Sequence, residues 1–435
     1  MKLPCLTGLI VAASWLAASP STFGAAGFKI SAANRTGTIT WTNAYTNGIC
    51  TVETAANPAG PWQPRQNYFT TGLVGQAGVT LSLGNQFLRL LAADISTNAP
   101  LAFSNLVNSY SVLRTIAGNG FGSEDVTNYW QASFEGGFAT NAALSRPHFA
   151  MADNAGNIFI VDKDSHSVLK VATNGRIYTV AGTHLAGNGS DSATPGTNVA
   201  LRFPNGLWVR GDGTVYVLDT DNAKVRRLDT NGTMTTLFTV GGGITTGRGL
   251  WVKDDESIIY FSSGGSLRKR VPGTVSTLNN NFNELGNIVV NAHGDVMATD
   301  RGNHRVYIVD DTGAGAGSRT NIAGNGNTTP FVSGTSVLTN GLNGVRGIWY
   351  LPNGGYLLAL HEGSKIAYVD PAGRVHLFLD GLTSPNHSGD GQWFHSPGAK
   401  IAEPRSVSMD SRGNILIVEN DAGYVRMIEF QRLTP

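Results

Sequence analysis

A polar residue recurs along the chain at the start of short apolar stretches, and its chemistry suggests ligand binding. Arginine presents a rigid fork of N–H donors that matches carboxylates and phosphates. Equivalent strands arranged around one axis would bring these side chains to one opening. The sequence therefore predicts a pocket for an anionic or carbonyl-bearing ligand, formed by His148, Asn205, Arg248, Arg346 and Arg405, with Gly286 at the sixth equivalent position.

A second interpretation gives the same side chains a structural role. Buried charges are normally paired, so the arginines could bond acidic groups of neighbouring repeats. The acidic candidates are Asp162, Asp219 and Asp300. Under this interpretation the arginines stabilise the fold and are not available to a ligand.

Six copies of one repeat position these residues. The copies begin at segments 146–153, 203–209, 247–252, 286–290, 345–350 and 403–410. In each copy the apolar stretch is followed by a polar turn and a second short apolar strand. An acidic or polar residue then follows in five copies (Asp162, Asp219, Ser262, Asp300 and Glu419), and Leu360 takes its place in the fifth.

Each copy continues with a third strand, and most copies add a Gly-containing turn and a fourth. Four short strands joined by tight turns predict one antiparallel sheet, which cannot bury its faces alone. Six such sheets packed radially would bury them, as in a β-propeller. The sixth copy lacks its fourth strand, and residues 111–118, ahead of the first copy, supply a matching one. Such closure leaves no open sheet edge and argues against a solenoid of β units.

Over residues 111 to 430 the pattern resembles the NHL-repeat family of the secreted bacterial type. The phrase that carries the resemblance is a turn, an apolar strand, an acidic residue and a valine six positions later, as in Asp162 and Val168. The resemblance implies an all-β, six-bladed β-propeller that occupies residues 106–435.

The region ahead of the repeats divides into two parts. Residues 1–25 predict a signal peptide, with Lys2, an apolar run over 6–18 and small residues around Ala25. A membrane anchor is the alternative. Residues 27–105 do not repeat, and their alternating strands predict a small β-sandwich-like domain. We therefore expect a secreted protein, extracellular or periplasmic.

Composition narrows the classes of partner. A net charge of +1 gives no indication of a basic surface that would bind nucleic acid. After the N-terminal run there is no second long apolar stretch, so we predict no membrane span. We expect a monomer. If Cys5 leaves with the signal peptide, Cys50 has no disulfide partner in the chain and is predicted to be a buried, unreactive side chain.

Two families of propeller enzyme offer a metal-assisted alternative. Arg146-Pro147-His148 with Asp164-Ser165-His166 resembles a blade of the peptide-amidating lyases, which hold zinc with three histidines, but Asn205 and Arg405 replace two of them. Propeller lactonases hold calcium with Glu, Asn and Asp, which are the residue types of Asn205, Asn287, Asp300 and Glu419. The sequence assigns no metal ligand and no catalytic residue, and it leaves zinc or calcium in the channel as an alternative. His293, His361 and Glu362 are predicted to be solvated in turns.

Three insertions lengthen the connections between repeats, at 183–200, 327–341 and 383–400. They are either ordinary loops or one rim enlarged to contact a partner. The sequence favours a secreted binding or scaffold propeller that recognises a protein, peptide or glycan through one face. The competing hypothesis is a metal-assisted lyase or lactonase that uses the central channel.

Overall fold

The computed structural model describes residues 10–11, 27–34, 37–78, 87–122 and 124–433. The chain forms two compact units, one of Met1–Val112 with Glu429–Pro435 and the other of Leu113–Ile428. Apart from Ile10–Val11, the predicted signal peptide lies outside the described residues. No helix in the described part of the chain has the length and apolar character needed to span a bilayer.

The first unit is a small β-sandwich. One sheet has the order β1-β7-β4-β5 and the other β2-β3-β6. Trp41 from one sheet and Cys50, Val52 and Leu88 from the other share one buried cluster. Within the region predicted to form alternating strands, residues 79–86 lie outside the described residues. The strands are β1 (Ile10–Val11), β2 (Lys29–Ala33), β3 (Thr38–Thr42), β4 (Gly48–Ala55), β5 (Gln63–Thr70), β6 (Gly75–Gly78) and β7 (Phe87–Asp94), followed by helix α1 (Ala102–Val107).

The end of the chain belongs to this first unit. The Phe430 ring stacks on Phe69 at 4.7 Å and lies 4.8 Å from the Tyr110 ring, measured between centroids. Gln431 donates a hydrogen bond to the carbonyl oxygen of Pro64 at 2.9 Å. The sequence placed residues 429–435 with the propeller and ended the small domain at residue 105, whereas the first unit extends to Val112 and takes the C-terminal segment.

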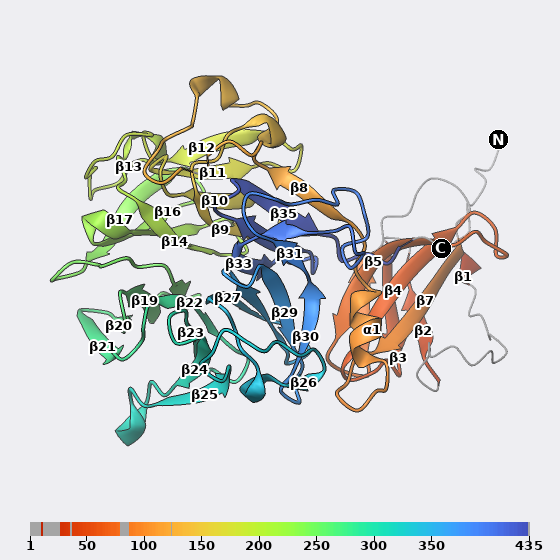
Figure 1. Cartoon of the computed structure of the whole chain (residues 1–435). Helices are drawn as coiled ribbons and strands as arrows, with labels where there is room; N and C mark the ends of the chain where they lie inside the picture. Colours follow the sequence, from red (N-terminus) through yellow and green to blue (C-terminus); the bar gives the residue numbers. More distant parts are fainter. Residues whose placement is uncertain (1–9, 12–26, 35–36, 79–86, 123, 434–435) are drawn as a thin grey trace, which may run out of the picture. The chain divides into compact units, whose positions relative to one another are not determined.

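The second unit consists of antiparallel sheets of four or five strands (Figure 1). In chain order their strands are β9 (Pro147–Ala152), β10 (Ile158–Asp162), β11 (Ser167–Val171) and β12 (Ile177–Ala181); β13 (Thr194–Pro195), β14 (Pro204–Val209), β15 (Val215–Asp219), β16 (Lys224–Leu228) and β17 (Thr233–Thr239); β18 (Leu250–Val252), β19 (Ile259–Ser263), β20 (Ser266–Val271) and β21 (Thr274–Asn279). The chain continues with β22 (Leu285–Val290), β23 (Val296–Asp300), β24 (Arg305–Val309) and β25 (Arg319–Ala323); β26 (Thr335–Ser336), β27 (Val345–Tyr350), β28 (Tyr356–Leu360), β29 (Lys365–Val369) and β30 (Arg374–Leu379); and β33 (Pro404–Met409), β34 (Ile415–Glu419) and β35 (Tyr424–Ile428) with β8 (Leu113–Ala117).

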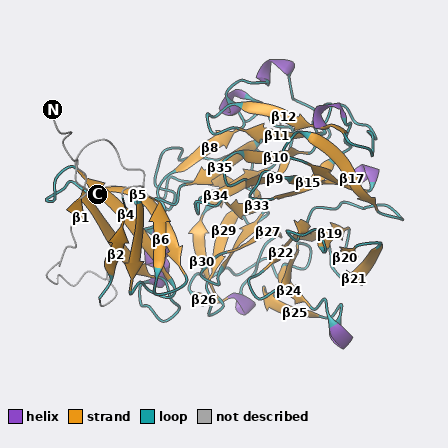
Figure 2. Ribbon diagram, turned by 180° about the vertical axis from the view of Figure 1, so that it is seen from behind, coloured by secondary structure: helices purple, strands orange, loops and turns teal. Residues whose placement is uncertain are grey.

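Helix in the second unit is confined to short 3-10 turns (Figure 2). These are η1 (Ala132–Phe134), η2 (Ala139–Asn141), η3 (Gly196–Asn198), η4 (Thr220–Asn222), η5 (Gly313–Gly315) and η6 (Val337–Thr339). A separate two-stranded pair, β31 (Gly381–Leu382) and β32 (Ile401–Ala402), leads into the last sheet.

The sheets of the second unit form a β-propeller. Their first strands contact one another in the order β9, β14, β18, β22, β27, β33 and back to β9. β8, from the start of the unit, pairs antiparallel with β35 and completes the last sheet. Apolar side chains fill the spaces between neighbouring sheets: Ile160 and Leu169 of the first sheet share a cluster with Leu416, Val425 and Ala117 of the last.

Glycine at the start of the first strands permits their close approach. A Cβ at Gly249 would lie 2.7 Å from the carbonyl oxygen of Gly286 in the next sheet. A Cβ at Gly206 would lie 2.9 Å from the carbonyl oxygen of Arg248. Because real Cβ contacts are longer than this, a larger residue would push the strands apart and widen the ring.

The recurrent acidic residue has a local structural role. Asp162 accepts a hydrogen bond from the backbone N–H of Ser145, 17 residues earlier, at 2.7 Å. Asp219 does the same for Arg202, and Asp300 for Asn283, each with the same separation in sequence. Each carboxylate thus fixes the loop that leads into the first strand of its own sheet.

Candidate functional site

Four of the five predicted site residues occupy β-bulges, and the fifth, Arg248, precedes β18. Pro147 lies opposite Asp162 and Phe149 opposite Val161, so His148 between them has no partner in the ladder. Asn205, Arg346 and Arg405 are skipped in the same way in their own sheets. A bulge redirects the side chain of the extra residue, so these four side chains depart from the alternation of their strands.

A left-handed residue precedes every one of these positions. The residue two places earlier has φ between 37° and 65°, a region that non-glycine residues rarely adopt. Strain of this kind persists only where surrounding contacts hold it, and the acidic residues described above bond the same loops. The six residues are Arg146, Phe203, Thr246, Glu284, Gly344 and Glu403.

His148 and Asn205 form one side of the site. The Nδ1 atom of His148 is in hydrogen-bond contact with the side-chain oxygen of Asn205, and both residues are buried. Burial and the charges of Arg405, Lys163 and Arg248 lower the pKa of His148 well below its usual value. The imidazole is therefore neutral at pH 7, and with Nδ1 donating to Asn205 its Nε2 carries a lone pair.

Three arginines form the other side, and they differ in how their charge is balanced. Arg248 lies 3.6 Å from Glu284, and Arg346 lies 3.0 Å from Glu362. Arg405 donates only to the amide oxygen of Asn420, at 3.3 Å, and forms no ion pair with any residue that the structure describes. Arg405 is therefore a buried cation without a direct counter-charge.

The pKa values of these arginines reflect mutual repulsion in a dry site. Burial, then the charges of Arg346 and Arg248, lower the pKa of Arg405 well below the usual guanidinium value. Burial is also the main cause for Arg346, whose pKa falls to about 10 although Glu362 opposes the change. The Nε atoms of Arg248 and Arg346 are buried and have no hydrogen-bond partner in the described structure. All three arginines thus lie close enough for their charges to act on one another.

The acidic partners suggested from the sequence are engaged elsewhere. Asp219 contacts Arg226 at 2.7 Å, and Asp300 contacts Arg319 at 3.2 Å. Asp162 and Asp164 hold backbone N–H groups of the loop around Ser145 and Val126. The structural interpretation of the site arginines is therefore wrong for these carboxylates, because they satisfy groups within their own sheets.

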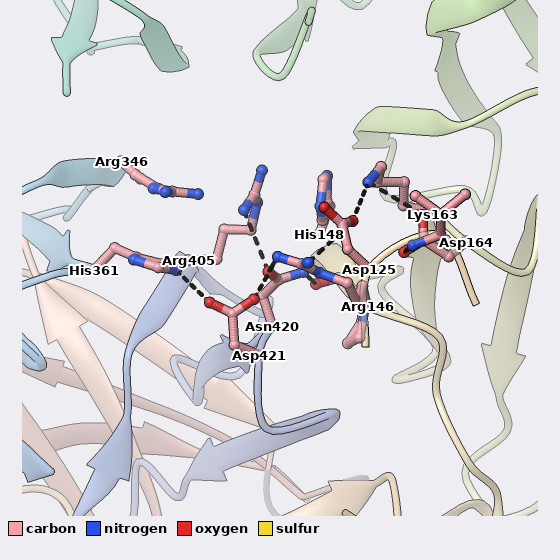
Figure 3. A network of polar contacts seen from close by, with 12 residues as sticks. Asp125, Arg146, His148, Lys163, Asp164, Arg346, His361, Arg405, Asn420 and Asp421 are labelled. Atoms are coloured by element: carbon pink, nitrogen blue, oxygen red, sulfur yellow. Dashed lines mark hydrogen bonds and ion pairs between the residues drawn. The ribbon is translucent and has the colours of Figure 1, made fainter. Parts of the chain in front are cut away.

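A polar rim lies beside the site (Figure 3). Asp125 lies 3.0 Å from both Arg146 and Lys163, and Arg146 also contacts Asp421 at 2.6 Å. Burial alone would raise the pKa of Asp421, but the contact with His361 and the charges of Arg146 and Arg405 outweigh it and lower this pKa to about 2. The rim is thus a run of alternating charges.

His361 corrects one expectation from the sequence. It was predicted to be solvated in a turn, but only 5% of its surface is exposed. Its ring nitrogens lie 3.2 Å from Asp421 and 3.4 Å from Glu362. His361, Glu403 and Asp421 bring one possible ligand atom each to within 4.8 Å of one another. Glu362 itself is exposed, as expected for a turn, and it pairs with Arg301 and Arg346.

The residues suggested by the two enzyme families have structural partners. His166, from the zinc-lyase comparison, accepts the backbone N–H of Phe203 at 3.2 Å. Glu419, from the lactonase comparison, is fully buried and lies 3.1 Å from Arg426. Asn287 donates to the carbonyl oxygen of Ile348 at 3.1 Å. These contacts tie each residue to the scaffold.

Aromatic side chains meet deeper along the first strands. Trp208 of β14 lies 5.9 Å from Trp251 of β18 and 6.1 Å from Trp349 of β27, between ring centroids. Since β14 and β27 are not neighbours in the ring, the indoles fill the middle of the channel at this level. The polar site therefore has an apolar layer behind it.

Sequence reasoning missed the residues that complete the site from turns. They stand outside the strands, where the apolar pattern gives no guidance: Glu284, Glu362, Asn420, Asp421 and Asp125. One signal was available: Lys163-Asp164, His361-Glu362 and Asn420-Asp421 follow the second strand at equivalent places in three copies.

Comparisons with known proteins support the fold. Three solved structures share it: a protein of unknown function from Bacteroides thetaiotaomicron VPI-5482 (TM-score 0.58, 13% identity, 90% of this chain and 94% of that chain) and two auxiliary nutrient binding proteins. Those two come from Bacteroides thetaiotaomicron VPI-5482 (TM-score 0.55, 13% identity, 91% and 94%) and Bacteroides ovatus ATCC 8483 (TM-score 0.55, 14% identity, 90% and 94%). The chain is a propeller protein.

The sequence match covers a smaller share of the chain than these structural matches do. No family model matches the chain, so the assignment to NHL repeats remains a prediction. The curated Protein SUPPRESSOR OF QUENCHING 1, chloroplastic, of Arabidopsis thaliana is 27% identical over 163 residues. That match covers 37% of this chain and 14% of the plant protein.

Proposed function

We propose that the protein is a secreted binding propeller whose ring opening takes a carboxylate-bearing ligand. The observation that carries this proposal is Arg405, a buried guanidinium that has an amide but no carboxylate as its partner among the described residues. A buried charge is costly unless it is paired, and a ligand carboxylate would supply the missing charge in a bidentate contact.

The neighbours of Arg405 favour the same ligand. Arg346 and Arg248 add positive potential, and low-dielectric walls focus it at the opening. Neutral His148 and Asn205 can hydrogen-bond hydroxyl or carbonyl groups beside the carboxylate. Two proteins of the same fold are auxiliary nutrient binding proteins, which makes an acidic nutrient saccharide a reasonable first ligand to test. Secretion is proposed from the predicted signal peptide alone.

Uronic acids and their neutral counterparts test the proposal, because they differ only in the carboxylate. We expect galacturonate, or short oligomers of it, to bind in calorimetry, and galactose to bind at least about tenfold more weakly. Affinity should fall as salt is raised. Arg405→Gln should lose about tenfold or more, while Arg412→Gln, an exposed arginine in the same sheet, should bind normally. Equal affinity for acid and neutral sugar, or normal binding by Arg405→Gln, would overturn the proposal.

The metal-assisted enzyme remains the alternative function. The observation that favours it is the convergence of His361, Glu403 and Asp421 beside the arginines. This alternative function requires that His361, Glu403 and Asp421 bind a metal ion.

A further inference from the structure

We propose that His361, Glu403 and Asp421 bind a divalent cation of the zinc or manganese class at the propeller opening. The three residues come from separate segments: His361 follows β28, Glu403 precedes β33 and Asp421 follows β34. One ligand atom of each lies within 4.8 Å of the other two. The fold therefore brings together one imidazole and two carboxylates that are distant in sequence.

The partners of these groups point to a missing ligand. His361 is 5% exposed, and both of its ring nitrogens are buried without a geometrically sound hydrogen bond in the described structure. The Glu403 carboxylate has no hydrogen bond or ion pair with any described residue. Buried polar groups are normally satisfied, so a buried histidine without a sound hydrogen bond, near a half-buried carboxylate without a protein partner, suggests a shared ligand.

The spacing suits a small metal ion. Ligand atoms about 2.0 to 2.1 Å from a tetrahedral ion lie about 3.3 Å apart. The Nε2 atom of His361 and the Oδ2 atom of Asp421 are 3.2 Å apart, as Figure 3 illustrates by the dashed line between them. Only Glu403 has to approach further. It stands at the left-handed position of its sheet, with φ 37°, which commits its backbone to an unusual geometry.

The surroundings orient the histidine as in known metal sites. Its other nitrogen, Nδ1, faces Glu362 at 3.4 Å, and Arg346 holds Glu362 from the far side at 3.0 Å. Metal-bound histidines commonly direct their second nitrogen to a carboxylate, which fixes the ring and raises its basicity. Glu362 stands in that relation to His361.

The nearby arginines leave the required oxygens available. Arg146 contacts Asp421 through Oδ1, whereas Oδ2 faces His361. One nitrogen and two oxygen ligands suit zinc or manganese better than calcium, which prefers six to eight oxygens. Three protein ligands leave at least one coordination position open. Because a cation adds positive charge near Arg405, an oxyanion at that open position would offset it.

Metal titration of the full chain tests the proposal. After treatment with a chelator, we expect calorimetry to show one site per chain for Zn²⁺ or Mn²⁺ and weaker binding of Ca²⁺. Zn²⁺ should also raise the melting temperature. Co²⁺ should give a visible absorption band typical of nitrogen and oxygen ligands. No saccharide is present in these titrations, so a lack of metal binding would not contradict the uronate proposal. Likewise, a lack of uronate binding would not contradict the metal site.

Two variants locate the site. His361→Gln and Glu403→Gln should each weaken metal binding about tenfold or more and remove the Co²⁺ band. His376→Gln is the matched control, because His376 is partly buried and contacts the carboxylate of Asp370 at 3.1 Å outside the proposed site. Far-UV circular dichroism checks folding, and Glu403→Gln keeps the test valid if His361→Gln does not fold. The proposal is overturned if neither Zn²⁺ nor Mn²⁺ binds stoichiometrically, or if both folded variants bind metal as the wild type does.

Discussion

The guanidinium of Arg226 contacts the carboxylate of Asp219 at 2.7 Å, and neither side chain is exposed. Arg226 also donates to the carbonyl oxygen of Ser190, at 2.8 Å, within the insertion 183–200. Arg426 and Glu419 repeat the pair in the last sheet, where Arg426 reaches Asp390 of the insertion 383–400 at 2.5 Å. Two of the three insertions are thus fastened to their own sheets by a buried arginine.

Arg226→Met should be strongly destabilising. It leaves the buried Asp219 without its cation, a change that typically costs about 3 to 5 kcal/mol. Urea unfolding measures the loss. The control is Arg227→Ala, the adjacent residue, whose partly exposed ion pairs should contribute about 1 kcal/mol or less. Similar losses for the two variants would contradict the structural role of the pair.

Arg405 and Arg346 should respond differently to neutral substitution. Arg405→Gln removes an unpaired buried cation, so the free energy of unfolding should stay within about 1 kcal/mol of the wild type or rise. Arg346→Gln removes a partner of Glu362 and should lower the free energy of unfolding by about 1 to 3 kcal/mol. Melting curves recorded without ligand show which of the two variants is less stable. If Arg405→Gln were the more damaging change, Arg405 would be a structural residue.

Asp162 should make stability depend on pH. Burial is the main cause that raises its pKa from 3.8 to about 7, so the folded state holds this proton more tightly than the unfolded state. The contribution of Asp162 to the free energy of unfolding is therefore largest in acid. It declines as the pH rises from about 4 to about 7 and is constant above that. Asp162→Asn keeps an oxygen for the Ser145 N–H and should be more stable than the wild type at pH 8, by about 1 to 3 kcal/mol.

The difference between the two proteins at pH 4 is the internal control. Both side chains are neutral there, so their stabilities should converge. A gap of the same size at pH 4 and pH 8 would show that Asp162 does not titrate as proposed.

Cys50 should be unreactive in the native protein. It is fully buried in the first unit, and burial raises the pKa of its thiol to about 12, so almost no thiolate exists at pH 8. In a chain without residues 1–25, a disulfide reagent should label no thiol until guanidinium unfolds the protein, when it should label one. Rapid native labelling would mean that the first unit opens readily.

Removal of β8 should destabilise the propeller. Deleting Leu113–Ala117 exposes the edge of β35 and part of the apolar cluster between the first and last sheets. We expect a loss of several kcal/mol or insolubility. Deleting the exposed turn Gly313–Gly315 is the control and should change stability by less than about 1 kcal/mol. An unchanged melting temperature without β8 would refute closure by this strand.

The sequence predicted the repeating strands well, because their apolar and turn residues follow a period. Apolar alternation and turn residues identified β10, β15 and β34, and the match between β8 and other fourth strands indicated how the last sheet is completed. The bulges at His148 and Arg405 were not visible, since a bulge depends on the partner strand. The role of Asp162 was also missed, because its partner is a backbone N–H and not a side chain.

The carboxylates around the site were the hardest to predict. Glu284 and Glu403 share one left-handed position, yet other sheets place Phe203 or Gly344 there, so no residue type recurs. His361 and Glu362 look like an ordinary polar turn in sequence. Their contacts come from Asp421 and Arg301, which belong to other sheets.

The pairing of β8 with β35 also constrains how the chain can fold. β8 is among the first propeller residues to be synthesised, and its partner is the last strand of the unit. During synthesis or export the first sheets can assemble in order, but the final sheet has to wait for Ile428. Closure of the ring by β8 and β35 is therefore a late step that joins segments distant in sequence. Contacts between distant segments slow folding, because the chain between the two strands must be ordered first. A chain cut short anywhere before β35 would keep both the edge of β8 and the face of the first sheet uncovered, which marks it as a substrate for chaperones and proteases.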